Sequence, residues 1–128
     1  MTGGHVMCVT VDCPTVTINI NTPTRSIGPR GLELLHASPA PGVPEKAPLL
    51  FVHGLGHGAW CWSHWLEAAA AAGHPAYAVS LRGHGSSQGS LRTARLSHYV
   101  DDVVHTAASL PRRPVLVGHS LGGLVVQL

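Results

Sequence analysis

The chain has 128 residues, a length that fits one domain with its own buried core. Hydrophobic residues make up 45% of it and charged residues only 11%, against roughly 25% in ordinary soluble domains, which favours a largely buried sheet. The formal net charge of +2 comes from scattered residues without a basic run, so neither nucleic acid nor an anionic membrane is indicated as a partner.

Cysteine usage and the N-terminal segment suggest an intracellular protein. Cys8, Cys13 and Cys61 form no CxxC pair, and an odd number argues against a disulfide framework, so we expect reduced thiols. The start MTGGHVMCVTVDCPT lacks the features of a signal peptide, and no run of 18 apolar residues predicts a membrane span. His53 and His57 are the closest histidine pair, but they lie in a glycine-rich loop and not on an HExxH helix, so no zinc motif is predicted. We expect a cytoplasmic location and no metal or other cofactor, and the oligomeric state stays open.

Strands and helices are expected to alternate along most of the chain. Residues 1–30 carry β-branched runs at 6–11 and 15–20, which fit short strands or a hairpin and equally a loose extension. A strand is predicted at 31–37, followed by a proline-rich loop. Further on, apolar runs and helical periodicity predict strands at 49–54, 74–81 and 114–118, and helices at 59–73, at 96–110 and from 121.

This alternation with short connections predicts an α/β domain over residues 31–128, with a mostly parallel sheet and flanking helices. Residues 1–30 are either an extension or the first strands. In the helix at 96–110, Ser97 can cap the N-terminus, and Asp101 and Asp102 fit first-turn stabilisation of the helix. The apolar face expected for that helix consists of Val100, Val103, Val104 and Ala107.

The first glycine-rich loop admits a nucleotide-binding interpretation. Gly54, Gly56 and Ala59 satisfy G-x-G-x-x-A between a strand and a helix, as a dinucleotide site requires. Such a site needs an acid about 20 residues further on, but the next strand ends in Ser80-Leu81-Arg82 and offers no carboxylate. Arg82 could instead hold the 2′-phosphate of NADP.

The second loop predicts a nucleophilic serine. Gly118, Ser120 and Gly122 form G-x-S-x-G between a buried strand and the start of a helix, and a further Gly123 follows. The serine must project from a strained turn in which side chains two residues before and after it would collide, hence the glycines. The same turn aims the backbone N–H of Leu121 at the oxygen of the attacked carbonyl.

The phrases FVHGLGHGAWCW, LRGHGSS and LVGHSLGG, in this order, resemble the α/β-hydrolase superfamily over about residues 31–128. The first phrase is most similar to the plant esterase and hydroxynitrile-lyase branch and its bacterial relatives, whereas GHSLGG is shared widely among esterases, lipases and thioesterases. The resemblance implies that Ser120 is the nucleophile and that Leu55 and Leu121 donate the two oxyanion-hole N–H groups. The motif residues expected to support them are His53, Gly54, Gly118, His119, Gly122 and Gly123.

Plainer roles compete at several of these positions. His53 is interpreted as architectural, shaping the loop without transferring protons, and a serine that only caps a helix is the alternative at Ser120. His119 is expected to pack on the sheet or line the pocket, and His84 to sit in a structural turn. Trp60 is the tryptophan nearest the loop and the best candidate among the three for a pocket contact.

The catalytic triad cannot be completed within this sequence. The resemblance implies the order serine, acid, histidine, yet only LGGLVVQL follows Ser120. We therefore interpret the chain as the N-terminal half of an α/β-hydrolase fold, truncated after the nucleophile elbow, and expect poor folding and little or no turnover from it alone. The outer edge of the strand at 114–118 is expected to lack a partner, and the apolar C-terminal residues to have little cover.

The prediction is a serine hydrolase that forms an acyl-enzyme at Ser120 with a small-molecule carboxylic ester or thioester. A hydroxynitrile lyase of the same fold keeps this serine and is one alternative, and the NADP-binding Rossmann half is the other. Haloalkane dehalogenases and epoxide hydrolases are disfavoured because the resemblance assigns them an aspartate at this position.

Overall fold

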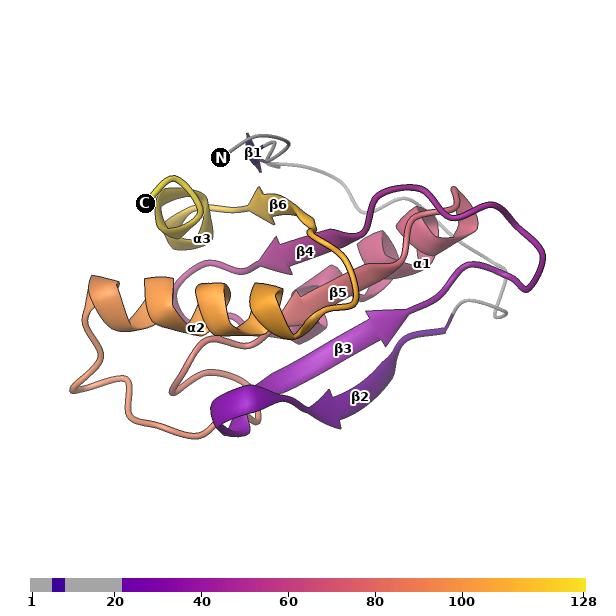
Figure 1. Cartoon of the computed structure of the whole chain (residues 1–128). Helices are drawn as coiled ribbons and strands as arrows, with labels where there is room; N and C mark the ends of the chain where they lie inside the picture. Colours follow the sequence, from indigo (N-terminus) through magenta and orange to yellow (C-terminus); the bar gives the residue numbers. More distant parts are fainter. Residues whose placement is uncertain (1–5, 9–21) are drawn as a thin grey trace.

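The computed structural model describes residues 6–8 and 22–128 and is built on a six-stranded sheet (Figure 1). The strand order is β1-β6-β4-β5-β3-β2. The pairs β1–β6, β6–β4 and β4–β5 are parallel, whereas β3 pairs antiparallel with both of its neighbours, β5 and β2. This mixed, mostly parallel sheet confirms the predicted α/β class. The strands are β1 (Val6–Cys8), β2 (Thr24–Ile27), β3 (Glu33–Ala37), β4 (Leu49–Val52), β5 (Ala76–Val79) and β6 (Val115–Gly118).

Helices cover both faces of the sheet, as predicted. A short 3-10 turn, η3 (Ala59–Trp62), leads into α1 (Ser63–Ala71) on one face, and α2 (Leu96–Ser109) and α3 (Leu121–Val125) lie on the other (Figure 1). A second 3-10 turn, η2 (Pro29–Gly31), precedes β3. Within the part of the chain that the structure describes, no helix has the length and apolar character to cross a bilayer.

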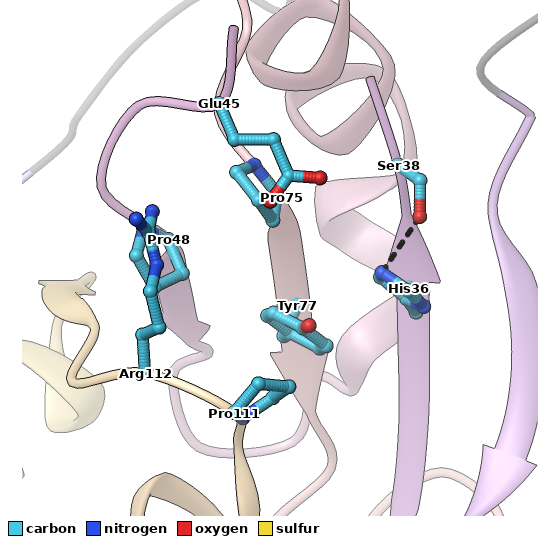
Figure 2. A pocket seen from close by; sticks show the side chains of 8 residues that line it. All are labelled: His36, Ser38, Glu45, Pro48, Pro75, Tyr77, Pro111 and Arg112. Atoms are coloured by element: carbon cyan, nitrogen blue, oxygen red, sulfur yellow. Dashed lines mark hydrogen bonds between the residues drawn. The ribbon is translucent and has the colours of Figure 1, made fainter. Parts of the chain in front are cut away.

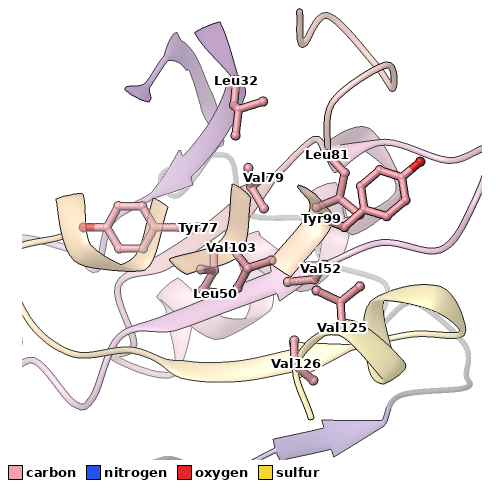
Figure 3. Packing of buried hydrophobic residues seen from close by; sticks show 10 residues of the cluster. All are labelled: Leu32, Leu50, Val52, Tyr77, Val79, Leu81, Tyr99, Val103, Val125 and Val126. Carbon is pink, nitrogen blue, oxygen red and sulfur yellow. The ribbon is translucent and has the colours of Figure 1, made fainter. Parts of the chain in front are cut away.

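The core is split by the sheet into two layers. Because side chains alternate along a strand, Leu50 and Val52 of β4 pack with α2 and α3, whereas Phe51 packs with α1 and η3. Both layers are apolar, which is why β4 needs the continuous apolar run seen in its sequence. Figure 3 shows the first layer, in which Val103 of α2 and Val125 and Val126 from the C-terminal end meet the central strands.

Helix α2 is rotated relative to the prediction. Its N-cap is Arg95, so Ser97 lies inside the helix and does not cap it. Val104 is 56% exposed, and the buried residues are Tyr99, Asp102, Val103 and Thr106. The first-turn role predicted for the aspartates is therefore wrong for both Asp101 and Asp102, since the first turn of α2 contains no acidic residue.

Of two expectations about the ends of the chain, one is wrong and the other holds only for part of the C-terminal residues. The outer edge of β6 is not free, because β1 pairs with it in parallel from Val6 opposite Leu116 to Cys8 opposite Gly118. Val125 and Val126 are covered by the core, and only Leu124 and Leu128 among the last apolar residues are exposed. The rest of the predicted runs at 6–11 and 15–20 lies outside the described residues.

Candidate active site

Three loops meet at one edge of the sheet. The last residues of the parallel strands β4, β5 and β6 are in register, since Val52 lies opposite both Val79 and Gly118. The segments that follow these strands, 53–58, 80–88 and 119–121, therefore leave the sheet side by side. This is the edge at which open α/β sheets place their ligands.

Ser120 occupies the turn between β6 and α3 in a strained conformation. Its φ of 56° and ψ of −118° are unusual for a residue with a Cβ atom and cost about 1–2 kcal/mol. The residue is exposed, and Gly122 N–H and Leu124 N–H close the turn on the carbonyls of His119 and Ser120. An exposed serine hydroxyl on a strained strand-to-helix turn is the arrangement that a nucleophile elbow requires.

The neighbouring glycines leave room that no side chain could occupy. A Cβ on Gly122 would lie 2.1 Å from the carbonyl oxygen of Val52, and one on Gly118 would lie 2.5 Å from the carbonyl oxygen of Gly122. A Cβ on Gly54 would approach the Cβ of Ser120 to 3.2 Å. The predicted steric reason for Gly118 and Gly122 is thus confirmed, and Gly123 is buried beside them.

His53 is a structural residue of this edge, as its interpretation from the sequence proposed. It is fully buried, and its Nε2 accepts a hydrogen bond from Leu81 N–H at 2.9 Å, so its Nδ1 carries the proton and donates to the Gly54 carbonyl at 2.7 Å. Burial lowers the pKa of His53 to about 4. A neutral ring with both nitrogens engaged cannot serve as a general base for Ser120.

The two backbone N–H groups expected to bind an oxyanion both come from these loops. Leu55 lies in a turn closed by His57 N–H on the Gly54 carbonyl at 3.1 Å, and Leu121 is the first residue of α3. Neither N–H has a hydrogen-bond partner among residues 6–8 and 22–128. Both are therefore available to an acceptor beside Ser120.

The remaining predicted positions lie around this centre in different roles. His119 is partly buried and its N–H donates to the Val52 carbonyl, while its ring faces that of His57 at 6.5 Å. Trp60 is exposed at the start of η3, with its ring 5.8 Å from His57. His84 is buried in the loop after β5 and bonds the Arg82 carbonyl, in line with a structural turn.

Arg82 forms a partly buried ion pair in place of the phosphate contact that the nucleotide hypothesis needs. Its guanidinium donates to Asp102 at 2.7 Å and to the carbonyl of His98, and its backbone N–H also bonds the Asp102 carboxylate. Asp102 is 1% exposed, so this pair accounts for its presence on the inner face of α2. No pattern in the sequence predicts this pair.

Two further buried polar residues were missed from the sequence. Glu33, in β3, and Ser80, directly after β5, are joined by a hydrogen bond of 2.8 Å close to the loop that contains Leu55. The available signals were a glutamate inside the apolar run GLELLHA and a serine ending AYAVS.

A separate pocket of about 250 Å³ lies at the opposite end of the sheet (Figure 2). It is lined in part by Pro48, Pro75 and Pro111, which precede β4, β5 and β6, and by the stacked rings of His36 and Tyr77, 4.4 Å apart. None of its lining residues belongs to the three loops around Ser120. The cavity and the serine are therefore distinct features of the molecule.

Comparison with known proteins agrees with this fold. A family model described as the alpha/beta hydrolase family matches residues 49–128, more than half of the chain. The chain belongs to this family. Similar solved structures include an epoxide hydrolase from Vigna radiata, with 26% identity and a TM-score of 0.66 over 88% of this chain and 34% of that one. A thioesterase domain from the curacin biosynthetic pathway, with 24% identity and a TM-score of 0.66 over 82% of this chain and 40% of its own, shares the fold.

Among curated relatives of this alpha/beta hydrolase are rice and Arabidopsis proteins named as esterases. The probable esterase PIR7A of Oryza sativa is 45% identical over 82 residues, 62% of this chain and 31% of the relative. Methylesterase 10 of Arabidopsis thaliana is 40% identical over 82 residues, 62% of this chain and 30% of the relative. The chain thus spans about a third of the length of the curated relatives it matches.

Proposed function

We propose that the chain supplies the nucleophile and the oxyanion-binding loops of a serine hydrolase that acts on a carboxylic ester or thioester. The observation that carries this proposal is the exposed Ser120 in its strained turn, near the N–H groups of Leu55 and Leu121, which have no hydrogen-bond partner among the described residues. Relatives named as esterases favour an ester, and the shared fold of a thioesterase domain is compatible with a thioester.

In the proposed reaction, the Oγ of Ser120 attacks the carbonyl carbon while a base removes its proton. The N–H groups of Leu55 and Leu121 bind the oxygen that becomes negative in the tetrahedral intermediate. Collapse of the intermediate breaks the bond to the alcohol or thiol, which leaves with the proton and forms the acyl-enzyme. Water then attacks the acyl carbon, the carboxylic acid is released and Ser120 regains its proton.

The base is proposed to come from the part of the hydrolase domain that this chain does not span. Within the described residues, Ser120 Oγ has no hydrogen-bond partner, and His53 is excluded by its engaged ring and lowered pKa. A serine without a base is a weak nucleophile, so slow reaction is expected unless a base is added.

The test is covalent labelling of the 128-residue chain by a fluorophosphonate, with imidazole added as an external base. Peptide mass spectrometry is expected to find the label on Ser120, at a rate that rises with imidazole concentration. Ser120→Ala should abolish labelling, while Ser97→Ala, at an exposed serine of α2, should leave it unchanged. Saturable binding of NADPH without labelling of Ser120 would instead support the nucleotide hypothesis.

A further inference from the structure

Glu33 is a buried carboxylate that gathers donors from three parts of the chain. It is 8% exposed, and its Oε1 accepts hydrogen bonds from Ser80 Oγ at 2.8 Å and Ser86 N–H at 3.2 Å. Its Oε2 accepts from Arg25 Nε at 2.7 Å. Burial raises the pKa of Glu33, but the hydrogen bonds from Ser80, Arg25 and Ser86 outweigh it and hold the pKa below its ordinary value. The side chain is therefore ionised near neutral pH.

The charge on Glu33 fixes the direction of the next hydrogen bond. Ser80 is fully buried, and an ionised carboxylate can only accept, so the single proton of the Ser80 hydroxyl points to Glu33. The lone pairs of the same oxygen are left to accept, and Ala59 N–H donates to it at 2.8 Å. Two hydrogen bonds in series, called the relay below, thus link Glu33 in β3 through Ser80 to Ala59, the first residue of η3.

The surrounding backbone is packed closely around this relay. A Cβ on Gly85, whose φ is +50°, would lie 2.5 Å from Glu33 Oε1 and 2.6 Å from Ser80 Oγ. Glu33 N–H also donates to Ser87 Oγ at 2.8 Å, and Ser87 Oγ in turn donates to the Ser80 carbonyl. The loop after β5 is therefore held against β3 on both sides of the carboxylate.

The relay ends at one end of the loop that contains Leu55. The other end is held by His53, whose ring links the Gly54 carbonyl to Leu81 N–H. Both anchors meet the neighbouring residues Ser80 and Leu81, so the loop 54–58 is fastened at its two ends to one short segment. Leu55 lies between the anchors with an exposed side chain that adds no buried contact of its own.

We propose that Glu33 and Ser80 are positioning residues, which fix the end of the 54–58 loop at Ala59 and thereby hold the Leu55 N–H in place for the oxyanion. This inference rests on the proposed function at Ser120. An oxyanion donor has to be within about 0.5 Å of its working position, and a misplacement of about 1 Å can cost on the order of a hundredfold in rate.

The first measurement is amide hydrogen exchange of Ala59 by NMR, taken relative to that of Leu81 in the same molecule. Leu81 N–H bonds to His53 and does not use the relay, so the ratio separates a local change from general loss of stability. Ser80→Ala and Glu33→Ala are expected to speed Ala59 exchange by roughly five- to tenfold relative to Leu81. Glu33→Gln keeps an oxygen acceptor and should restore most of the protection. The control Glu45→Ala removes an exposed carboxylate and should change nothing.

The second measurement is the rate of fluorophosphonate labelling of Ser120 in the same variants. Ser80→Ala is expected to slow it by about tenfold or more, and Glu33→Gln to slow it far less than Glu33→Ala. The inference is overturned if the Ala59 to Leu81 ratio is unchanged in Ser80→Ala, or if the ratio changes while the labelling rate does not. Absence of labelling in the unsubstituted chain would refute the function at Ser120, while Ala59 exchange would still decide whether the anchor exists.

Discussion

Gly122→Ala tests the closest approach in the candidate site. The added Cβ would lie 2.1 Å from the carbonyl oxygen of Val52 and 2.6 Å from that of His53. An ordinary contact begins at 3.4 Å, so α3 would have to move by about 1 Å away from β4. Both obstacles are backbone atoms at the end of a central strand, which no change of rotamer can relieve. We expect a loss of about 3 kcal/mol, the upper end of the usual range for overpacking.

The assay is urea unfolding followed by tryptophan fluorescence. With a slope of about 1–3 kcal/mol per molar urea, the transition midpoint should fall by about 1 M or more in Gly122→Ala. Gly28→Ala is the matched control, since its Cβ would meet only the Leu32 carbonyl oxygen at 3.7 Å and its φ is −91°. Equal midpoints for the two variants would refute the steric argument. These midpoints require a sharp transition in the unsubstituted chain, and such a transition would refute the expectation, drawn from the sequence, that the chain folds poorly.

Three further predictions concern the backbone strain at Ser120, the buried ring of His53 and the ion pair between Arg82 and Asp102. Ser120→Gly should stabilise the chain by about 1 kcal/mol in urea unfolding, because glycine tolerates the positive φ, whereas Ser120→Ala should bring no such gain in stability. Both variants should lose labelling by the fluorophosphonate. The free energy of unfolding should fall by roughly 3 kcal/mol as the pH drops from about 6.5 to about 4, because over this range His53 takes up a proton in the unfolded chain but not in the folded chain. Urea titrations at a series of pH values measure this dependence, and His53→Gln should make it less steep. Asp102→Ala should destabilise the chain by about 3 kcal/mol, because it leaves Arg82 without its ion-pair partner. The control Asp101→Ala, at an exposed position, should cost less than about 0.5 kcal/mol. Similar urea midpoints for the two variants would show that the ion pair does not stabilise the fold.

The sequence predicts those parts of the fold that are determined by residues close together in the chain. Examples are the apolar runs at β4 and β5 and the glycines around Ser120, since the pattern that predicts each of them spans only a few residues. The elbow was predicted for the same reason, since a turn that excludes Cβ atoms leaves glycines at fixed spacing. The roles of Ser120, Leu55 and Leu121 in catalysis remain predictions.

The parts that sequence reasoning missed depend on residues far apart in the chain. Glu33 meets Ser80 across 47 positions and Arg82 meets Asp102 across 20, and neither pair has a local pattern. Helical periodicity predicts Val104 on the inner face of α2, because the apolar pattern contains no sign that Asp102 is buried in an ion pair with Arg82. Strand β2 went unpredicted since all four of its residues are exposed and show no apolar alternation.

Acetylation by p-nitrophenyl acetate in the presence of imidazole measures whether Ser120 accepts an acyl group. After incubation and digestion, tandem mass spectrometry should find one acetyl group on Ser120, absent in Ser120→Ala. Because no base is in contact with Ser120 among the described residues, the acetyl group should persist once the imidazole is removed. Acetylation confined to Lys46 or the N-terminus, with Ser120 unmodified at every imidazole concentration, would show that Ser120 is not the nucleophile.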